Sequence, residues 1–163
     1  MTTIEKNIII STGFSHLIVH AMLLTFPSLY PSIKTIYNIS YDSFGSIVFF
    51  SSFLFGFGAI PAGYFENKIG CRKLLLLHLF GSSVLCFFIY LSKTFSSFIL
   101  GLCFLCFISS IYHPSGLTLI SKNVKRIESG MAIHGVFGNI GLAFGPMIAT
   151  FALSYFSWKH AYF

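Results

Sequence analysis

Long apolar runs separated by short polar or basic segments dominate the chain. Five of these runs cover residues 8–29, 44–64, 73–91, 95–120 and 130–156. Each is close to the length of about 20 residues that an apolar helix, rising about 1.5 Å per residue, needs to cross a hydrocarbon core of about 30 Å. The runs are continuous rather than alternating, which favours helices over the strands of a membrane barrel. The pattern predicts an all-α, polytopic membrane protein with about five transmembrane helices.

The composition leads to the same class of protein. Hydrophobic residues make up 55% of the 163 residues and charged residues only 9%, which leaves too little polar surface to cover a water-soluble globule. The net charge of +6 does not indicate a nucleic-acid partner, because the basic residues are not gathered in one run. We therefore expect the lipid bilayer as the surroundings and no nucleic acid as a partner.

Basic residues mark the ends of the predicted helices unequally. Seven fall on one side, namely Lys6, Lys68, Arg72, Lys73, Lys122, Lys125 and Arg126, and three fall on the other, namely Lys34, Lys93 and Lys159. Because cytoplasmic connections carry the excess of Lys and Arg, we expect the N-terminus in the cytoplasm. This predicts a multi-pass protein of the plasma (inner) membrane. Residues 157–163 then lie on the outer side, where they resemble the start of a sixth helix.

A basic hairpin at residues 63–73 is predicted to join the second and third helices. It carries Gly63, Asn67, Lys68, Gly70, Arg72 and Lys73. The hairpin resembles the signature loop between helices 2 and 3 of the major facilitator superfamily, roughly G-x-x-x-D-[RK]-x-G-[RK]-[RK]. In the resembling transporters this loop takes part in conformational switching. The chain has Asn67 where that pattern has Asp, and Glu66 stands one place earlier.

Small residues in the fifth predicted helix carry a second likeness. Gly138, Gly141 and Gly145 share one face at spacings of three and four, which predicts close packing against another helix. The segment Gly141-x-x-x-Gly145-Pro146 resembles the helix 5 motif G-x-x-x-G-P of the same superfamily. Three further stretches, 15–17, 112–114 and 134–141, are similar to its fosmidomycin-resistance branch.

The resemblance implies a fold and a function. Residues 1–163 would form a partial N-terminal lobe, with five helices and the start of a sixth in a family that normally has twelve. The implied activity is secondary active transport by alternating access, with export of a drug or other small molecule against proton entry. A complementary C-terminal lobe or a second copy of the chain would then be a partner.

Histidines are the candidate groups for a substrate or proton pathway. The candidates are His16, His20, His113 and His134, together with Asn139. His16 and His20 are four residues apart and so share a helix face. All four acidic residues lie at predicted membrane edges, which leaves imidazoles as the groups inside the membrane that titrate near neutrality.

Other uses of these residues lead to competing hypotheses. His16 and His20 have a spacing that suits binding of a metal ion or haem, and His113 could be a further ligand. Such a site requires ligands at the same membrane depth on facing helices, which a sequence does not show. We expect no metal and no cofactor. Cys103 and Cys106 form a C-x-x-C inside an apolar helix without a second pair, which favours core thiols over a zinc or redox site.

The sequence also argues against catalysis. It has no glycine-rich phosphate loop with a lysine, no paired carboxylates and no G-x-S-x-G elbow. We therefore do not expect an enzyme. A non-transporting membrane protein that serves only as a helical partner remains the alternative to a transporter.

The charge count gives a topological prediction. A reporter fused after Lys125 should report the cytoplasm, and the same reporter fused after Lys93 should report the exterior. Paired phosphatase and fluorescent-protein fusions measure this directly. Swapped results would overturn the orientation.

Overall fold

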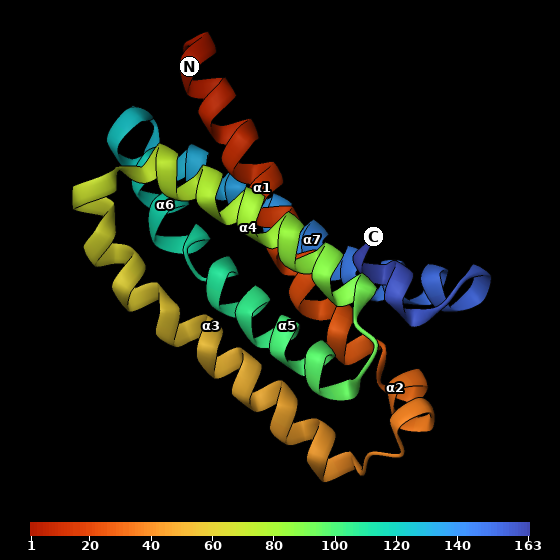
Figure 1. Ribbon diagram of the computed structural model, residues 1–163. Coiled ribbons are helices and arrows are strands. Elements are labelled where there is room, and N and C mark those ends of the chain that lie inside the picture. Colours follow the sequence, from red (N-terminus) through yellow and green to blue (C-terminus); the bar gives the residue numbers. More distant parts are fainter.

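The computed structural model describes all 163 residues, and the chain forms helices with no strands. The helices are α1 (Thr3–Ser28), α2 (Tyr30–Tyr37), α3 (Tyr41–Ile69), α4 (Cys71–Leu91), α5 (Phe95–Ser109), α6 (Tyr112–Asn123), α7 (Ile127–Tyr155) and the 3-10 helix η1 (Trp158–Tyr162). Five segments are long and apolar enough to cross a membrane: α1, α3, α4, α7, and α5 with α6 taken together (Figure 1). The prediction of an all-α protein with five transmembrane helices is confirmed.

Several helices extend beyond the apolar runs. α1 begins at Thr3 rather than residue 8, because the Thr2 backbone N–H donates to Glu5 Oε2 at 2.6 Å in a capping box. α3 continues to Ile69 instead of residue 64, and α7 begins at Ile127 instead of residue 130. Polar residues therefore extend these helices past the hydrophobic positions that predicted them.

The predicted basic hairpin at 63–73 is wrong in its local structure. Most of it is helical, because α3 and α4 are separated only by Gly70. Gly70 has a φ of +87°, a conformation that glycine adopts without steric cost. One residue thus reverses the chain between two membrane-spanning helices.

The single helix predicted at 95–120 is two helices. α5 ends at Ser109, and α6 begins at Tyr112 with Pro114 in its first turn. Pro114 has no N–H to donate to the carbonyl of Ser110, so one hydrogen bond of the helical ladder is missing at this point. His113 therefore lies in the first turn of a separate helix.

The two groups of basic residues occupy opposite ends of the bundle. The N-terminus, the α3–α4 turn and the α6–α7 connection lie at one end, while α2, the α4–α5 connection and η1 lie at the other (Figure 1). At the first end Lys122 Nζ lies 3.9 Å from Glu66 Oε1, and the Lys125 backbone N–H donates to Glu5 Oε1 at 2.9 Å. The acidic groups at this end thus hold neighbouring helices together.

At the second end Lys159 Nζ donates to the carbonyl oxygen of Ser92, which joins η1 to the end of α4. The residues predicted to start a sixth helix form η1, and Trp158 of η1 is buried in the main apolar core. This core lies at the α2 end, and α5 contributes the buried side chains of Phe98, Leu102 and Leu105 to it.

α5 and α6, the two parts of the interrupted span, form the centre of the bundle. α5 packs between α3 and α4, and α6 contacts α1, α3, α4 and α7. Tyr112 at the start of α6 and Ile120 near its end are fully buried. α3 lies on the outside and exposes several large aromatic side chains, among them Phe49, Phe53 and Phe57.

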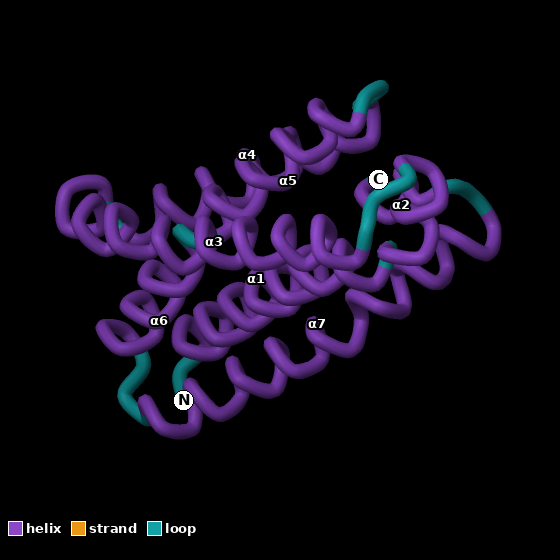
Figure 2. Tube along the Cα trace, turned by 90° about the horizontal axis from the view of Figure 1, so that it is seen from below, coloured by secondary structure: helices purple, strands orange, loops and turns teal.

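α1 and α7 pack against each other along their lengths (Figure 2). The structure places Gly138, Gly141 and Gly145 on the face of α7 that meets α1, and all three are buried. A Cβ at Gly145 would lie 2.7 Å from Leu24 Cβ, and one at Gly141 would overlap the Leu17 backbone. The glycines therefore allow the two backbones to approach more closely than any side chain would permit.

The same packing predicts unequal responses to added methyl groups on α7. Gly141→Ala should lower the free energy of unfolding by about 1–3 kcal/mol, because the new Cβ forces α1 and α7 apart. Gly135→Ala, on the same helix with no atom within 4 Å of the new Cβ, is the matched control and should change it by about 0.5 kcal/mol or less. Unfolding in mixed micelles measures both, and equal effects would contradict the packing role.

Candidate functional site

Five polar aromatic side chains meet where α1, α6 and α7 converge. They are His16 and His20 of α1, Tyr112 and His113 of α6, and His134 of α7, here called the histidine cluster. The His16 ring stacks on His134 with centroids 4.1 Å apart and planes 14° from parallel. The His113 ring meets His16 edge-on at 5.1 Å. His16 is therefore the centre of the cluster.

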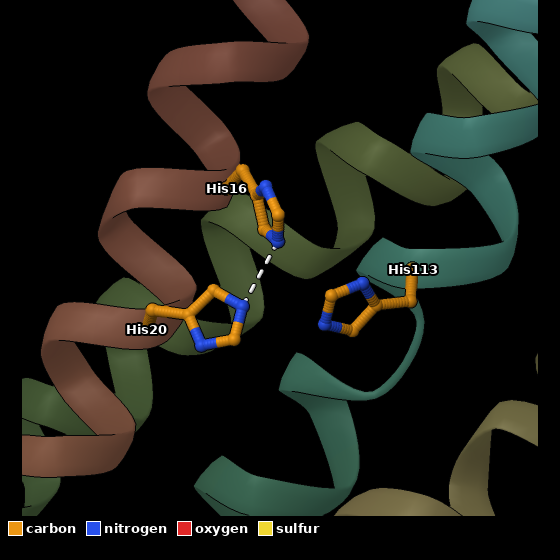
Figure 3. Close-up of side chains that lie close together, drawn as sticks. All are labelled: His16, His20 and His113. Carbon is orange, nitrogen blue, oxygen red and sulfur yellow. Dashed lines mark hydrogen bonds between the residues drawn. The ribbon is translucent and has the colours of Figure 1, made fainter. Parts of the chain in front are cut away.

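Hydrogen bonds fix the protonation of the His16–His20 pair in its neutral state. His16 Nδ1 lies 3.0 Å from the carbonyl oxygen of His134, which can only accept, so Nδ1 carries the hydrogen and donates. His16 Nε2 is then unprotonated, and it accepts from His20 Nε2 at 2.9 Å (Figure 3). The contact between α1 and α7 thus selects the tautomers of both rings.

Tyr112 anchors the cluster from α6. Its hydroxyl donates to the carbonyl oxygen of Thr12 in α1 and lies 3.4 Å from His134 Nδ1. The Tyr112 side chain is completely buried, and its ring lies 5.6 Å from that of His78 in α4, which is also completely buried. Tyr112 therefore links the three helices that carry the histidines to a fourth.

One side of the cluster is open to a cavity. His16 and His134 are buried, whereas His20 and His113 are half-buried. His20 lines a cavity of about 240 Å³ between α1, α3, α5 and α7, which Ser51, Ser52 and Phe55 of α3 also line. The Phe55 ring lies 5.5 Å from that of His113. A small molecule or ion that enters this cavity reaches His20 first among the imidazoles of the cluster.

No acidic side chain belongs to the cluster. Glu5, Asp42 and Glu128 lie in the first turns of α1, α3 and α7, and Glu66 lies in the last turn of α3. The groups that can exchange protons inside the bundle are therefore imidazoles, tyrosines and cysteines. A charge that appears in the cluster has no carboxylate beside it.

The other site residues named from the sequence lie elsewhere. Asn139 is exposed and does not belong to the cluster. Of the loop residues, Gly63 is half-buried on α3 and the rest, Asn67, Lys68, Gly70, Arg72 and Lys73, are exposed. Pro146 is exposed on α7, beside the buried glycine face. The acids that the structure buries at this end are Glu5 and Glu66, and Glu66 Oε1 lies 3.9 Å from Lys122 Nζ.

Two features of the site were missed by sequence reasoning. Tyr112 entered it only as a neighbour of His113 in a motif, and its bond to α1 depends on the helix break that the apolar run conceals. His78 is buried next to Tyr112, but it stands alone in an apolar helix without a spacing that would signal a role. Only the position of Tyr112 directly before His113 could have drawn attention to it.

Residues 12–163 match the family model of the Major Facilitator Superfamily. The match begins within α1 and includes every residue of the histidine cluster. The resemblance carried by the glycine motif and the basic segment is confirmed at the level of the superfamily.

The anchoring role of Tyr112 predicts a loss of stability without loss of the fold. Tyr112→Phe removes the bond to the Thr12 carbonyl and should lower the free energy of unfolding by about 1 kcal/mol. Tyr155→Phe, at a side chain 71% exposed, is the control and should have an effect below about 0.5 kcal/mol. Thermal unfolding in detergent compares the two; an unchanged midpoint in Tyr112→Phe would show that the bond adds nothing.

Proposed function

We propose that this chain, which belongs to the major facilitator superfamily, is part of a secondary active transporter that exports a small molecule in exchange for protons. The superfamily consists of membrane transport proteins, and the five apolar helices make the chain a multi-pass membrane protein. The observation that carries the proposal of proton coupling is the hydrogen-bonded pair of His16 and His20 in the middle of α1.

The pair offers a place for one additional proton. In the neutral state His20 donates from Nε2 to His16 Nε2, which leaves His20 Nδ1 able to accept. A proton that binds there makes His20 a cation and turns the existing bond into a stronger, charge-assisted one. Imidazole is the side chain whose unperturbed charge change falls in the pH range of a cell, which makes the pair the candidate for proton uptake and release.

The cavity beside His20 supports a common pathway for protons and substrate. A substrate in the space between α1 and α3 contacts His20 and approaches His113, so its binding changes the surroundings of the protonated group. Such mutual influence is the requirement for exchange of one for the other. We place His134 behind His16 as the residue that orients it.

Alternating access needs a second bundle that rocks against the first around the site. We propose that a complementary C-terminal lobe or a second copy of this chain supplies it. The Glu66–Lys122 contact at the basic end joins α3 to α6 within this bundle, which supports movement of the bundle as one body. The excess of basic residues at this end supports a cytoplasmic N-terminus in the plasma membrane.

The motifs around the histidines support the fosmidomycin-resistance branch, with drug export as the activity. The relevant stretches are 112–114, which holds His113, and 134–141, which holds His134 and the first two glycines of the packing face. Fosmidomycin is therefore the substrate probe that best tests the proposal.

Everted membrane vesicles that hold the native gene product test the exchange. Respiration acidifies the interior, and acridine orange reports the pH gradient. Fosmidomycin should dissipate the gradient as the drug enters and protons leave, and His16→Gln and His20→Gln should each reduce this response at least fivefold. His160→Gln, in η1 outside the membrane-spanning segments, is the control and should respond like the native protein.

The results separate the parts of the proposal. A full response in both variants would show that protons are coupled elsewhere than at the pair. Absence of any response that depends on the protein would overturn fosmidomycin export.

A further inference from the structure

We propose that His16, His20 and His113 form a binding site for a divalent transition-metal ion such as Zn²⁺. The spacing of His16 and His20 made a metal site a competing hypothesis, but it did not show whether His113 lies at the depth of the other two. In the structure the ring nitrogens of the three residues that serve as ligands all lie within 4.8 Å of one another (Figure 3). The inference goes beyond the proposed function, since it concerns binding and requires no transport.

The spacing of the nitrogens is close to that of a zinc site. With Zn–N bonds of 2.0–2.1 Å, two ligands of a tetrahedral ion lie about 3.3 Å apart. The Nε2 atoms of His16 and His20 are 2.9 Å apart and must separate slightly, whereas the other nitrogen pairs must approach by at most about 1.5 Å. His20 and His113 are half-buried whereas His16 is buried, so these two side chains have more room to rotate.

His16 is held in the form that binds a metal. Metal-binding histidines usually donate their second ring N–H to a carbonyl or carboxylate, which fixes the ring and its tautomer. The His134 carbonyl does this for His16 Nδ1 at 3.0 Å and leaves Nε2 free to coordinate. Stacking of the His134 ring on His16 further restricts the plane of the ligand.

The donor set indicates the class of ion. Imidazole nitrogens suit zinc, nickel and copper, whereas magnesium and calcium require oxygen ligands. Three histidines leave the fourth position of a tetrahedral ion empty, and the cavity beside His20 gives water or a small molecule access to it. Because all three ligands are neutral, the ion is held without a compensating carboxylate, which favours reversible binding.

Protons compete with the metal for the same nitrogens. The proton that His20 donates to His16 must move to His20 Nδ1 or to water before both Nε2 atoms coordinate one ion. The other titratable groups that face the cluster are Tyr112 of α6, His134 of α7 and His78 of α4, with Cys106 of α5 at the cavity. Metal affinity should therefore fall as the pH falls.

Equilibrium dialysis of the purified chain in detergent, without a histidine tag, measures the site. Zn²⁺ should bind at one ion per chain, and the affinity should fall at least tenfold between pH 7.5 and pH 5.5. His16→Gln and His113→Gln should each weaken binding at least tenfold. His160→Gln lies outside the membrane-spanning segments and should bind like the native chain.

A second variant distinguishes loss of a metal ligand from loss of the fold. His113→Cys keeps a metal ligand at this position, so it should still bind one Co²⁺ ion, with a new sulfur-to-cobalt charge-transfer band in the near ultraviolet. Unchanged Zn²⁺ affinity in both glutamine variants, or absence of that band in a folded His113→Cys protein, would overturn the metal site.

The metal site and the proposed function can fail separately. Fosmidomycin–proton exchange in a protein that binds no Zn²⁺ would overturn the metal site alone. Stoichiometric Zn²⁺ binding that depends on His16 and His113 would support it even if fosmidomycin caused no proton movement.

Discussion

The close approach of α1 and α7 is the contact on which the site depends. In lipid, apolar surfaces gain little by leaving the solvent, so helices associate where small residues allow backbone contact. Gly138 does more than permit this approach, because a Cβ there would lie 2.7 Å from His16 Nδ1. The glycine thus provides the space for the imidazole ring, and the nearby His134 carbonyl accepts its hydrogen bond. The same face of α7 therefore determines both how α1 packs and which nitrogen of His16 carries the hydrogen.

The break between α5 and α6 is the second feature that brings the side chains of the histidine cluster together. Since Pro114 cannot continue the hydrogen-bond ladder of α5, the chain restarts as a helix at Tyr112. Tyr112 reaches the Thr12 carbonyl, and His113 beside it turns toward the pair on α1. The irregular backbone therefore lies where the functional groups converge, inside the bundle and away from lipid.

Much of the fold follows from patterns that a sequence shows directly. The five membrane spans follow from the length of the apolar runs, and the spacing of Gly138, Gly141 and Gly145 marks one face of one helix. The break at Ser110 could not be located, because Pro114 alone does not mark one: Pro61 and Pro146 lie inside the unbroken helices α3 and α7. The length of α3 was also hidden, since its last turn consists of polar residues that the hydrophobic pattern does not count.

The candidate site was only partly visible for related reasons. Four histidines could be named as candidates, but the distance between His16 and His134, 118 residues apart, depends on how α7 packs on α1. At the basic end the motif directed attention to position 67. Because α3 continues through this position, neighbouring residues are turned by about 100° from each other, and Glu66 is the one that faces α6.

The absence of a carboxylate gives the cluster its physical character. A proton on the His16–His20 pair, or a metal ion on the three ligands, adds positive charge where the bundle has only neutral groups. Such a charge is costly inside a membrane unless an opposite charge or water approaches it. The cavity beside His20 is the side from which either can come. What fills the cavity therefore sets the free-energy cost of a cation on the cluster, and exchange requires that a bound substrate raises the cost of holding the proton.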